Sequence, residues 1–198
     1  TKKDQAVLED KREDFLKVNK NQILFANKWV ANDTIKQPNL AKTLEAIMLN
    51  GRDEFYKGQT AKKLASFIQA NGGVITVDDL ASYQAIWRKP ITFEYDNLNI
   101  ISMSPPSSGG ICLGQILKQI EDFNLDEFGH NSLKSIQVIT EAERRAYADR
   151  SFYLGDPDFV TIPHDQLLSD AYLKNRMANF SFDKATPSST ISHGKVDI

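Results

Sequence analysis

The chain has 198 residues, of which 41% are hydrophobic and 25% are charged, and this is the composition of an ordinary globular protein. The 24 basic and 26 acidic residues nearly cancel, so the charge balance favours neither nucleic acid nor an anionic membrane as a partner. No apolar run reaches the roughly 18 residues that a transmembrane helix needs. The charged N-terminus has no signal-peptide core, and the single Cys112 excludes an internal disulfide.

The first half of the chain is predicted to be helical. Residues 5–19 mix charged and apolar residues as an amphipathic helix does. A second helix is expected from an N-cap at Asn39 to Gly51, and Leu40, Leu44, Ile47 and Met48 follow the helical spacing of an apolar stripe. A third helix is expected over residues 59–70. Thr76 and Asp79 then predict a capping box that opens a short helix ending near Tyr83.

A change of period to two predicts a β-hairpin near residues 91–103. Ile91, Phe93 and Tyr95 alternate with polar residues, Asp96-Asn97 predicts a turn, and Leu98–Met103 is the second strand. A lone hairpin is marginally stable in water. We therefore expect it to pack on a helix or to pair with strands outside these residues.

Three further elements follow the hairpin. A helix after Gly110 is expected to bury an apolar stripe, and a long helix is expected from about Ser132 to Leu154. On the long helix we expect Leu133, Ile136, Ile139 and Tyr147 to form the apolar side, and Glu141, Arg145 and Asp149 to lie four residues apart on the exposed side. Ser169 is predicted to cap a last helix through about Asn179, before a polar tail.

The stretch Ser107-Ser108-Gly109-Gly110 at a predicted helix start is a candidate anion site. Free N–H groups and the positive end of the helix dipole favour an anion there. The motif alone favours a simpler interpretation, in which the serines cap the helix and the glycines let it pack at a tight corner.

A second candidate is the run of charges that comprises Glu141, Glu143, Arg144, Arg145, Asp149 and Arg150. Such a run is more often a solvated face or a structural ion-pair network than acid–base machinery. Because charged residues are seldom buried unpaired, we expect at least one of Asp149 and Arg150 to point inward with a partner.

The remaining reactive side chains indicate no catalytic centre. His130, His164 and His193 are far apart and lack metal-ligand spacing, and Cys112 is predicted to be a small buried hydrophobe. No nucleophile, base and orienting group stand at a spacing that predicts an acyl-transfer site.

Four stretches together resemble the large subunit of the γ-glutamyltranspeptidases. They are "NLAKTLEAIMLNGRDEFYKGQTAKKLA" from Asn39, "NGGVITVDDLASYQA" from Asn71, "SMSPPSSGGI" from Ser102 and "EAERRAYADRSFYLGDPDF" from Glu141. They stand in the family's order and at its spacing, and the resemblance extends over about residues 10–195.

The resemblance implies an N-terminal nucleophile hydrolase, so the expected fold is mainly α with one β-hairpin, as a fragment of the αββα sandwich. It also implies a precursor that cleaves itself into a large and a small subunit. The new N-terminal threonine of the small subunit attacks the γ-glutamyl amide of glutathione and related compounds, with its own α-amino group as the base. No metal or organic cofactor is implied.

The resemblance assigns no catalytic, substrate-binding or metal-binding residue to this chain. Thr190 is followed by Ile191-Ser192-His193, which does not match the family's Thr-(Thr/Ser)-His, so the nucleophile is expected shortly beyond Ile198. Ser107–Gly110 look like the small subunit's serine and glycine pairs without being them. The family's substrate arginine lies upstream of Thr1, and none of the five arginines considered as substitutes takes its place: Arg52, Arg88, Arg144, Arg145 and Arg150.

These expectations define a domain plan and a rival. Residues 1–180 are expected to be the helical part of the large subunit, and residues 181–198 an extended tail leading toward the autoprocessing site. The implied partner is the small subunit, the implied substrates are γ-glutamyl compounds, and the implied location is periplasmic or secreted. The rival is a non-enzymatic helical binding module with an anion-binding turn at Ser107–Gly110.

Overall fold

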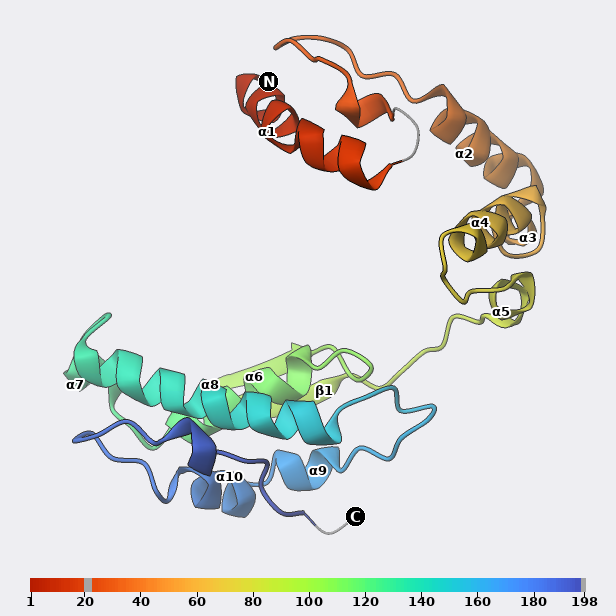
Figure 1. The fold of residues 1–198 in the computed structure, drawn as a ribbon. Helices are drawn as coiled ribbons and strands as arrows, with labels where there is room; N and C mark the ends of the chain where they lie inside the picture. Colours follow the sequence, from red (N-terminus) through yellow and green to blue (C-terminus); the bar gives the residue numbers. More distant parts are fainter. Residues whose placement is uncertain (20–22, 197–198) are drawn as a thin grey trace. The chain divides into compact units, whose positions relative to one another are not determined.

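The computed structural model describes residues 1–19 and 23–196. The chain divides into two compact units, Thr1–Ala85 and Ile86–Ile198. Helices dominate both units, and the described residues contain a single two-stranded sheet, so the prediction of a mainly α fold with one β-hairpin is confirmed (Figure 1).

The first unit contains α1 (Lys2–Val18), η1 (Leu24–Ala26), α2 (Pro38–Asn50), α3 (Arg52–Tyr56), α4 (Gln59–Ala70) and α5 (Val77–Ser82). The three longer helices and the capping box of Thr76 with Asp79 were all predicted. Helix α2 begins at Pro38 and not at an N-cap Asn39, because the fixed φ of proline suits a first helical position. Gly51 ends α2 with a φ of +67°, which glycine adopts readily.

The apolar stripe of α2 is not buried within this unit. Leu40 is 48% exposed, Leu44 57% and Met48 74%, and neither α1 nor α2 contains a buried residue. The buried residues of this unit, among those the structure describes, are three alanines: Ala26, Ala61 and Ala65. The pattern identified the helix correctly, but periodicity alone does not say whether a neighbour covers its apolar side.

The second unit begins with the predicted hairpin. Strands β1 (Ile91–Tyr95) and β2 (Leu98–Ser102) pair antiparallel, with Ile91 opposite Ser102. Ile91 and Phe93 face inward and are 7% and 8% exposed, as the alternation predicts. They join a core cluster with residues of the helices that follow, so the hairpin is stabilised by packing on helices.

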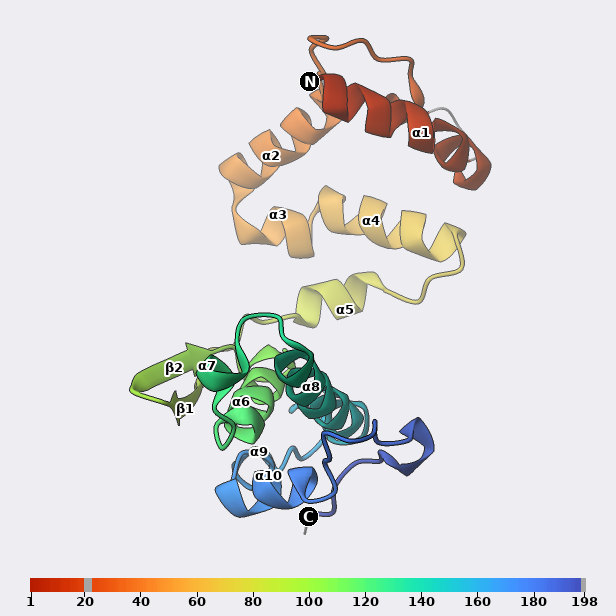
Figure 2. The same ribbon diagram turned by 90° about the vertical axis from the view of Figure 1, so that its left-hand side faces the viewer.

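Helix α6 (Gly109–Ile120) lies at the centre of the second unit. The other elements are α7 (Leu125–Phe128), α8 (Leu133–Tyr153), α9 (His164–Leu167), α10 (Asp170–Met177) and η2 (Ser188–Thr190). Helix α6 packs against the hairpin, α8, α9 and α10 (Figure 2). One core cluster lies where α6 meets β1, and a second one joins Ile120 to Val138 and Ala142 of α8.

The long helix α8 buries a different face from the one predicted. Leu133 is 80% exposed, Ile136 51% and Tyr147 56%, whereas Ile139, the fourth residue of the predicted apolar side, is half-buried and packs on a core cluster. The face turned inward carries small residues, Ala142 and Ala146, beside a row of polar and charged side chains. Apolar periodicity fails here because this face packs partly against polar chain segments, where hydrogen bonds replace apolar contact.

The stretch between β2 and α6 is the tight corner that the motif favours. The Gly110 N–H donates to the Met103 carbonyl at 3.2 Å, which draws the helix start onto the strand. A Cβ at Gly110 would overlap the Met103 carbonyl oxygen and lie 3.0 Å from Cβ of Ile91. Glycine is therefore required where the backbone of α6 approaches β1.

Candidate functional site

Five side chains on α8 stand four residues apart: Gln137, Glu141, Arg145, Asp149 and Tyr153. Residues at i and i+4 are neighbours on a helix surface, each offset by about 40° from the one before, so these five form one row that winds slowly around α8, here called the polar row. Every member of the row contacts the tail, which we define as residues Ser181–Val196.

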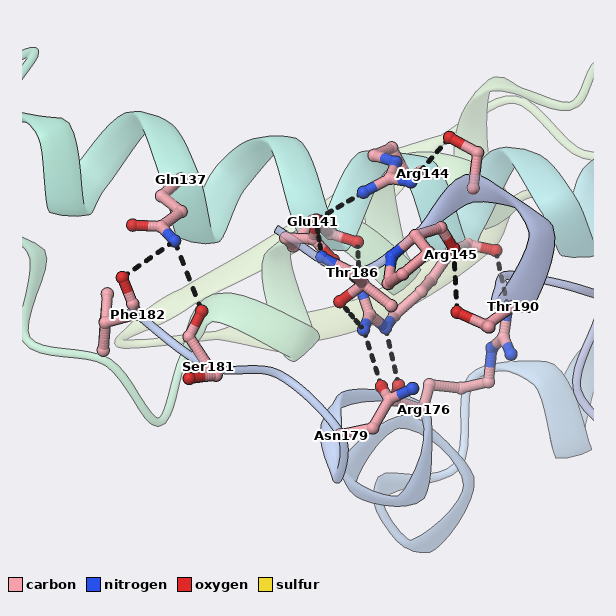
Figure 3. Close-up of polar contacts among 12 residues, drawn as sticks. Gln137, Glu141, Arg144, Arg145, Arg176, Asn179, Ser181, Phe182, Thr186 and Thr190 are labelled. Carbon is pink, nitrogen blue, oxygen red and sulfur yellow. Dashed lines mark hydrogen bonds and ion pairs between the residues drawn. The ribbon is translucent and has the colours of Figure 1, made fainter. Parts of the chain in front are cut away.

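The first contact is made by Gln137. Its side-chain amide Nε2 donates to the carbonyls of Ser181 at 3.2 Å and Phe182 at 3.1 Å, as Figure 3 shows. The ring of Phe182 packs edge-on against those of Phe123, Phe128 and Phe180. Backbone hydrogen bonds and an aromatic cluster thus hold the beginning of the tail.

The middle of the row is a buried ion pair. Glu141 and Arg145 are 3% and 2% exposed, and their side chains meet at 2.5 Å. Glu141 also accepts the Thr186 backbone N–H at 3.3 Å, and Arg145 donates to the Thr186 hydroxyl at 3.2 Å (Figure 3). Arg145 further donates to the Arg176 carbonyl and to Asn179, so the pair connects α8, the end of α10 and the tail.

The Glu141 carboxylate is kept ionised by its neighbours. Burial raises the pKa of this carboxyl, but hydrogen bonds from Arg145 and Thr186 and the charges of Arg145 and Arg144 outweigh burial, so that the pKa lies below the ordinary value of 4.5. Arg144, at the edge of the site, binds Glu141 from outside and donates to the Ser188 hydroxyl at 3.0 Å.

Asp149 is the centre of the second half of the row. It is 1% exposed, and its Oδ2 accepts from Gln115 Nε2 at 3.0 Å and from the Tyr172 hydroxyl at 2.8 Å. Its Oδ1 accepts the Gly194 backbone N–H at 2.8 Å and pairs with Arg176 at 3.0 Å. A buried carboxylate is stable when it is paired and hydrogen-bonded in this way.

The two tyrosines near Asp149 act as hydrogen-bonding groups. Burial, the hydrogen bond to Asp149 and its charge raise the pKa of Tyr172 far above its ordinary value, so Tyr172 remains a donor. The Tyr153 hydroxyl donates to the Gly194 carbonyl at 2.5 Å and accepts the Val196 N–H at 3.3 Å. His193 stacks on Phe152 with ring centroids 3.5 Å apart.

The tail runs parallel to α8. Successive members of the row contact tail residues 181, 186 and 194 in ascending order. The spacing predicts that Glu141, Arg145 and Asp149 lie on the exposed side of α8, and this prediction is wrong because the tail covers them. The sequence pattern did not identify four residues of this network: Gln137, Tyr153, Tyr172 and Arg176. Gln137 and Tyr153 did carry a signal, because they lie four residues before Glu141 and four residues after Asp149.

The prediction for Asp149 and Arg150 is confirmed for Asp149. Asp149 points inward with partners, whereas Arg150 is exposed and donates from Nε to the Ser108 hydroxyl at 2.9 Å. The charge run is thus a structural ion-pair network over Glu141, Arg145 and Asp149, with Glu143 left exposed.

The structure gives no support to an anion site at Ser107–Gly110. The Gly109 N–H lies 3.3 Å from the Ser107 hydroxyl, and the Gly110 N–H is used by Met103, so both donors are engaged within the chain. Ser108 is the N-cap residue, yet its hydroxyl bonds to Arg150 and makes no cap bond to the helix. The expected serine capping is therefore wrong for Ser108.

The other candidate residues named from the sequence lie outside the polar row. Cys112 is 6% exposed as predicted, and burial raises the pKa of its thiol. His130 and His164 are exposed, and Thr190 is an exposed residue whose hydroxyl donates to the Pro187 carbonyl at 2.8 Å. Arg88 pairs with Asp158 at 2.7 Å.

Within residues 1–19 and 23–196, no group of three or more His, Cys, Asp or Glu side chains is placed to hold a metal ion. No helix in that part of the chain is both long and apolar enough to cross a lipid bilayer. Arg52 lies in the first unit, with its guanidinium 4.4 Å from the centre of the Tyr56 ring.

The fold is that of a segment of an N-terminal nucleophile hydrolase. It matches the crystal structure of Helicobacter pylori γ-glutamyltranspeptidase with a TM-score of 0.87 and 43% identity, over 96% of this chain and 56% of that one. A cephalosporin acylase from Bacillus halodurans shares the fold with a TM-score of 0.75 and 22% identity, over 89% of this chain and 34% of that one.

The sequence narrows this class to one family. The γ-glutamyltranspeptidase family model matches residues 1–197, and the chain belongs to this family. It is 50% identical over 164 residues to the glutathione hydrolase proenzyme of Escherichia coli K12, which covers 83% of this chain and 28% of that protein. The corresponding proenzyme of Pseudomonas aeruginosa PAO1 is 42% identical over 166 residues, which is 83% of this chain and 30% of that protein. The chain thus spans less than a third of each of these two relatives.

Proposed function

We propose that the chain is the large-subunit segment of a γ-glutamyltransferase and glutathione hydrolase. The observation that carries this proposal is the 50% identity to a glutathione hydrolase proenzyme over 83% of the chain. In the whole protein, a threonine beyond this chain cleaves γ-glutamyl amides such as glutathione. The present residues form the scaffold and are inactive alone.

The proposed reaction has two acyl-transfer steps. The threonine hydroxyl oxygen adds to the γ-carbonyl carbon of the substrate, and its proton passes to the threonine's own α-amino group. The carbon–nitrogen bond breaks, the amine leaves with a proton, and the glutamyl group remains as an ester on threonine. Water or the amine of an amino acid or peptide then takes the glutamyl group and regenerates the hydroxyl.

That mechanism requires a free α-amino group on the threonine, and therefore a cleaved precursor. Hydrolysis of the peptide bond before the threonine consumes one water, leaves a carboxylate at the end of the large subunit and frees the amine. We propose that residues 181–198 lead toward this bond and that the small subunit is the partner. The location is proposed as periplasmic or secreted, as the family resemblance implies.

The test compares two proteins that differ in their C-terminal extent. Purified full-length precursor is expected to convert into two subunits and then hydrolyse γ-glutamyl-p-nitroanilide. Residues 1–198 alone are expected to keep their mass for days and to give no turnover above the blank. A matched control replaces the predicted nucleophilic threonine by alanine in the precursor. Turnover by residues 1–198 that follows the protein through purification would refute the proposal.

A further inference from the structure

We propose that the polar row is a guide that fixes the register of the tail, and so sets where the precursor cleaves itself. Glu141 and Asp149 are its positioning residues, and Gly194 is the tail residue whose place against Asp149 sets the register. The inference rests on the proposed function, because it presumes that the peptide bond to be cleaved follows the tail.

The two buried carboxylates bind the tail at matching intervals. Glu141 accepts the backbone N–H of Thr186 and Asp149 accepts that of Gly194, so the anchors are eight residues apart on both segments. Eight residues of helix rise only about 12 Å. Eight extended residues reach about 26–29 Å, so the tail carries slack between its anchors, part of which is taken up by the turn η2 (Ser188–Thr190). The extra chain length between Thr186 and Gly194 therefore leaves the position of Gly194 unchanged.

Gly194, at the second anchor, lies directly against the end of the Tyr172 side chain. A Cβ on residue 194 would overlap the Tyr172 hydroxyl oxygen and lie 2.7 Å from Cε2 and Cζ of its ring. A shift of the tail by one residue would bring His193 or Lys195 into that place. Either side chain would have to displace the end of Tyr172, whose hydroxyl is bonded to Asp149, and this favours a single register.

The backbone around Gly194 is hydrogen-bonded through both its N–H and its carbonyl group. Asp149 takes the N–H of Gly194 while the Tyr153 hydroxyl binds its carbonyl and the N–H of Val196. These contacts involve backbone groups, and the carboxylate is buried, so breaking them leaves unpaired polar groups. These contacts fix the position and direction of the backbone from Gly194 to Val196.

The test follows self-cleavage of the full-length precursor with Asp149→Asn and Gly194→Ala. The amide that replaces the carboxylate presents a donor to neighbours that are themselves donors, and the added methyl group pushes the tail from Tyr172. Displacing a reacting group by about 1 Å can cost about 10²-fold in rate, so we expect both variants to cleave at least about tenfold more slowly. Intact mass gives the rate and the site of cleavage.

Two controls separate guiding from stability. Glu143→Gln makes the same carboxylate-to-amide change on the exposed side of α8 and is expected to cleave at the wild-type rate. Gln115→Leu removes a hydrogen bond of Asp149 that does not involve the tail, and is expected to slow cleavage less than Gly194→Ala does. All rates are measured well below each variant's melting temperature.

The outcomes are distinct. Wild-type precursor that never cleaves overturns the proposed function and the inference together. Wild-type cleavage with Gly194→Ala cleaving at the wild-type rate overturns the inference alone, even if Asp149→Asn fails to fold. Equal slowing by Gln115→Leu and Gly194→Ala also overturns it, because stability would then account for both effects.

Discussion

Adjacent charged residues on α8 have opposite environments. Asp149 is buried with four hydrogen-bonding or ionic partners, while Arg150 next to it is exposed and contacts Ser108. A helix turns by about 100° per residue, so neighbours in sequence face different surroundings. The cost of removing a charge is therefore set by its side of the helix.

The residue Arg145 is predicted to be the most costly charge to remove. Arg145→Ala leaves Glu141 buried without its main partner and is expected to lower the free energy of unfolding by about 3–5 kcal/mol. Arg150→Ala removes one exposed contact and is expected to cost about 0–1 kcal/mol. Urea unfolding of both variants in the same chain measures the difference. Equal losses would contradict the structural role of the buried network.

At the scale of elements, the corner between β2 and α6 depends on one glycine of an adjacent pair. Gly110 approaches Met103 and Ile91, whereas a Cβ on Gly109 would meet only the Ser107 hydroxyl oxygen, at 3.4 Å. Both positions carry glycine, but only Gly110 has the Met103 carbonyl and the Ile91 side chain close to it. Close packing of a helix on a strand therefore selects glycine at one position and tolerates a side chain at the other.

The pair allows a matched test of the corner. Gly110→Ala forces the helix start away from the strand and is expected to cost about 1–3 kcal/mol of stability, as overpacking does. Gly109→Ala is expected to be nearly neutral, because its methyl group meets one movable side-chain atom. Thermal melting of the two variants at the same protein concentration gives the comparison. A loss for Gly109→Ala as large as that for Gly110→Ala would show that the helix start, and not the packing, is sensitive.

At the scale of the whole molecule, the two units differ in how much they bury. The second unit has two hydrophobic clusters and the buried polar row, whereas the described buried residues of the first are Ala26, Ala61 and Ala65. Leu49, Phe67 and Val74 of the first unit are more than two-thirds exposed. Burial of apolar area is the main driving force of folding, so the units should differ in stability by themselves.

Residues 86–198 expressed alone are expected to melt cooperatively, with the helical content of the second unit retained. Residues 1–85 alone are expected to show a broad, weakly cooperative transition, because short helices without a core are marginal in water. Circular dichroism melts of the two pieces and of the whole chain test this. A sharp transition for residues 1–85 would show that its local contacts suffice.

The sequence by itself determined the elements that depend on local physics. The capping box of Thr76 with Asp79, the end of α2 at Gly51, the turn at Asp96-Asn97 and the start of α8 after Ser132 all rest on hydrogen bonds or φ angles within a few residues. The alternation in β1 also predicted its inward face, and four stretches in order were enough to indicate the family.

Tertiary structure alone decided which face of each helix is covered. The same four-residue spacing of Glu141, Arg145 and Asp149 suits an exposed salt-bridged face and a buried network equally well, since it describes the helix and not its surroundings. Only the tail, more than thirty residues later in the chain, supplies the N–H groups of Thr186 and Gly194 that make burial of two carboxylates favourable. Contacts between distant segments carry no local signal, and for this reason the polar row became visible only in the fold.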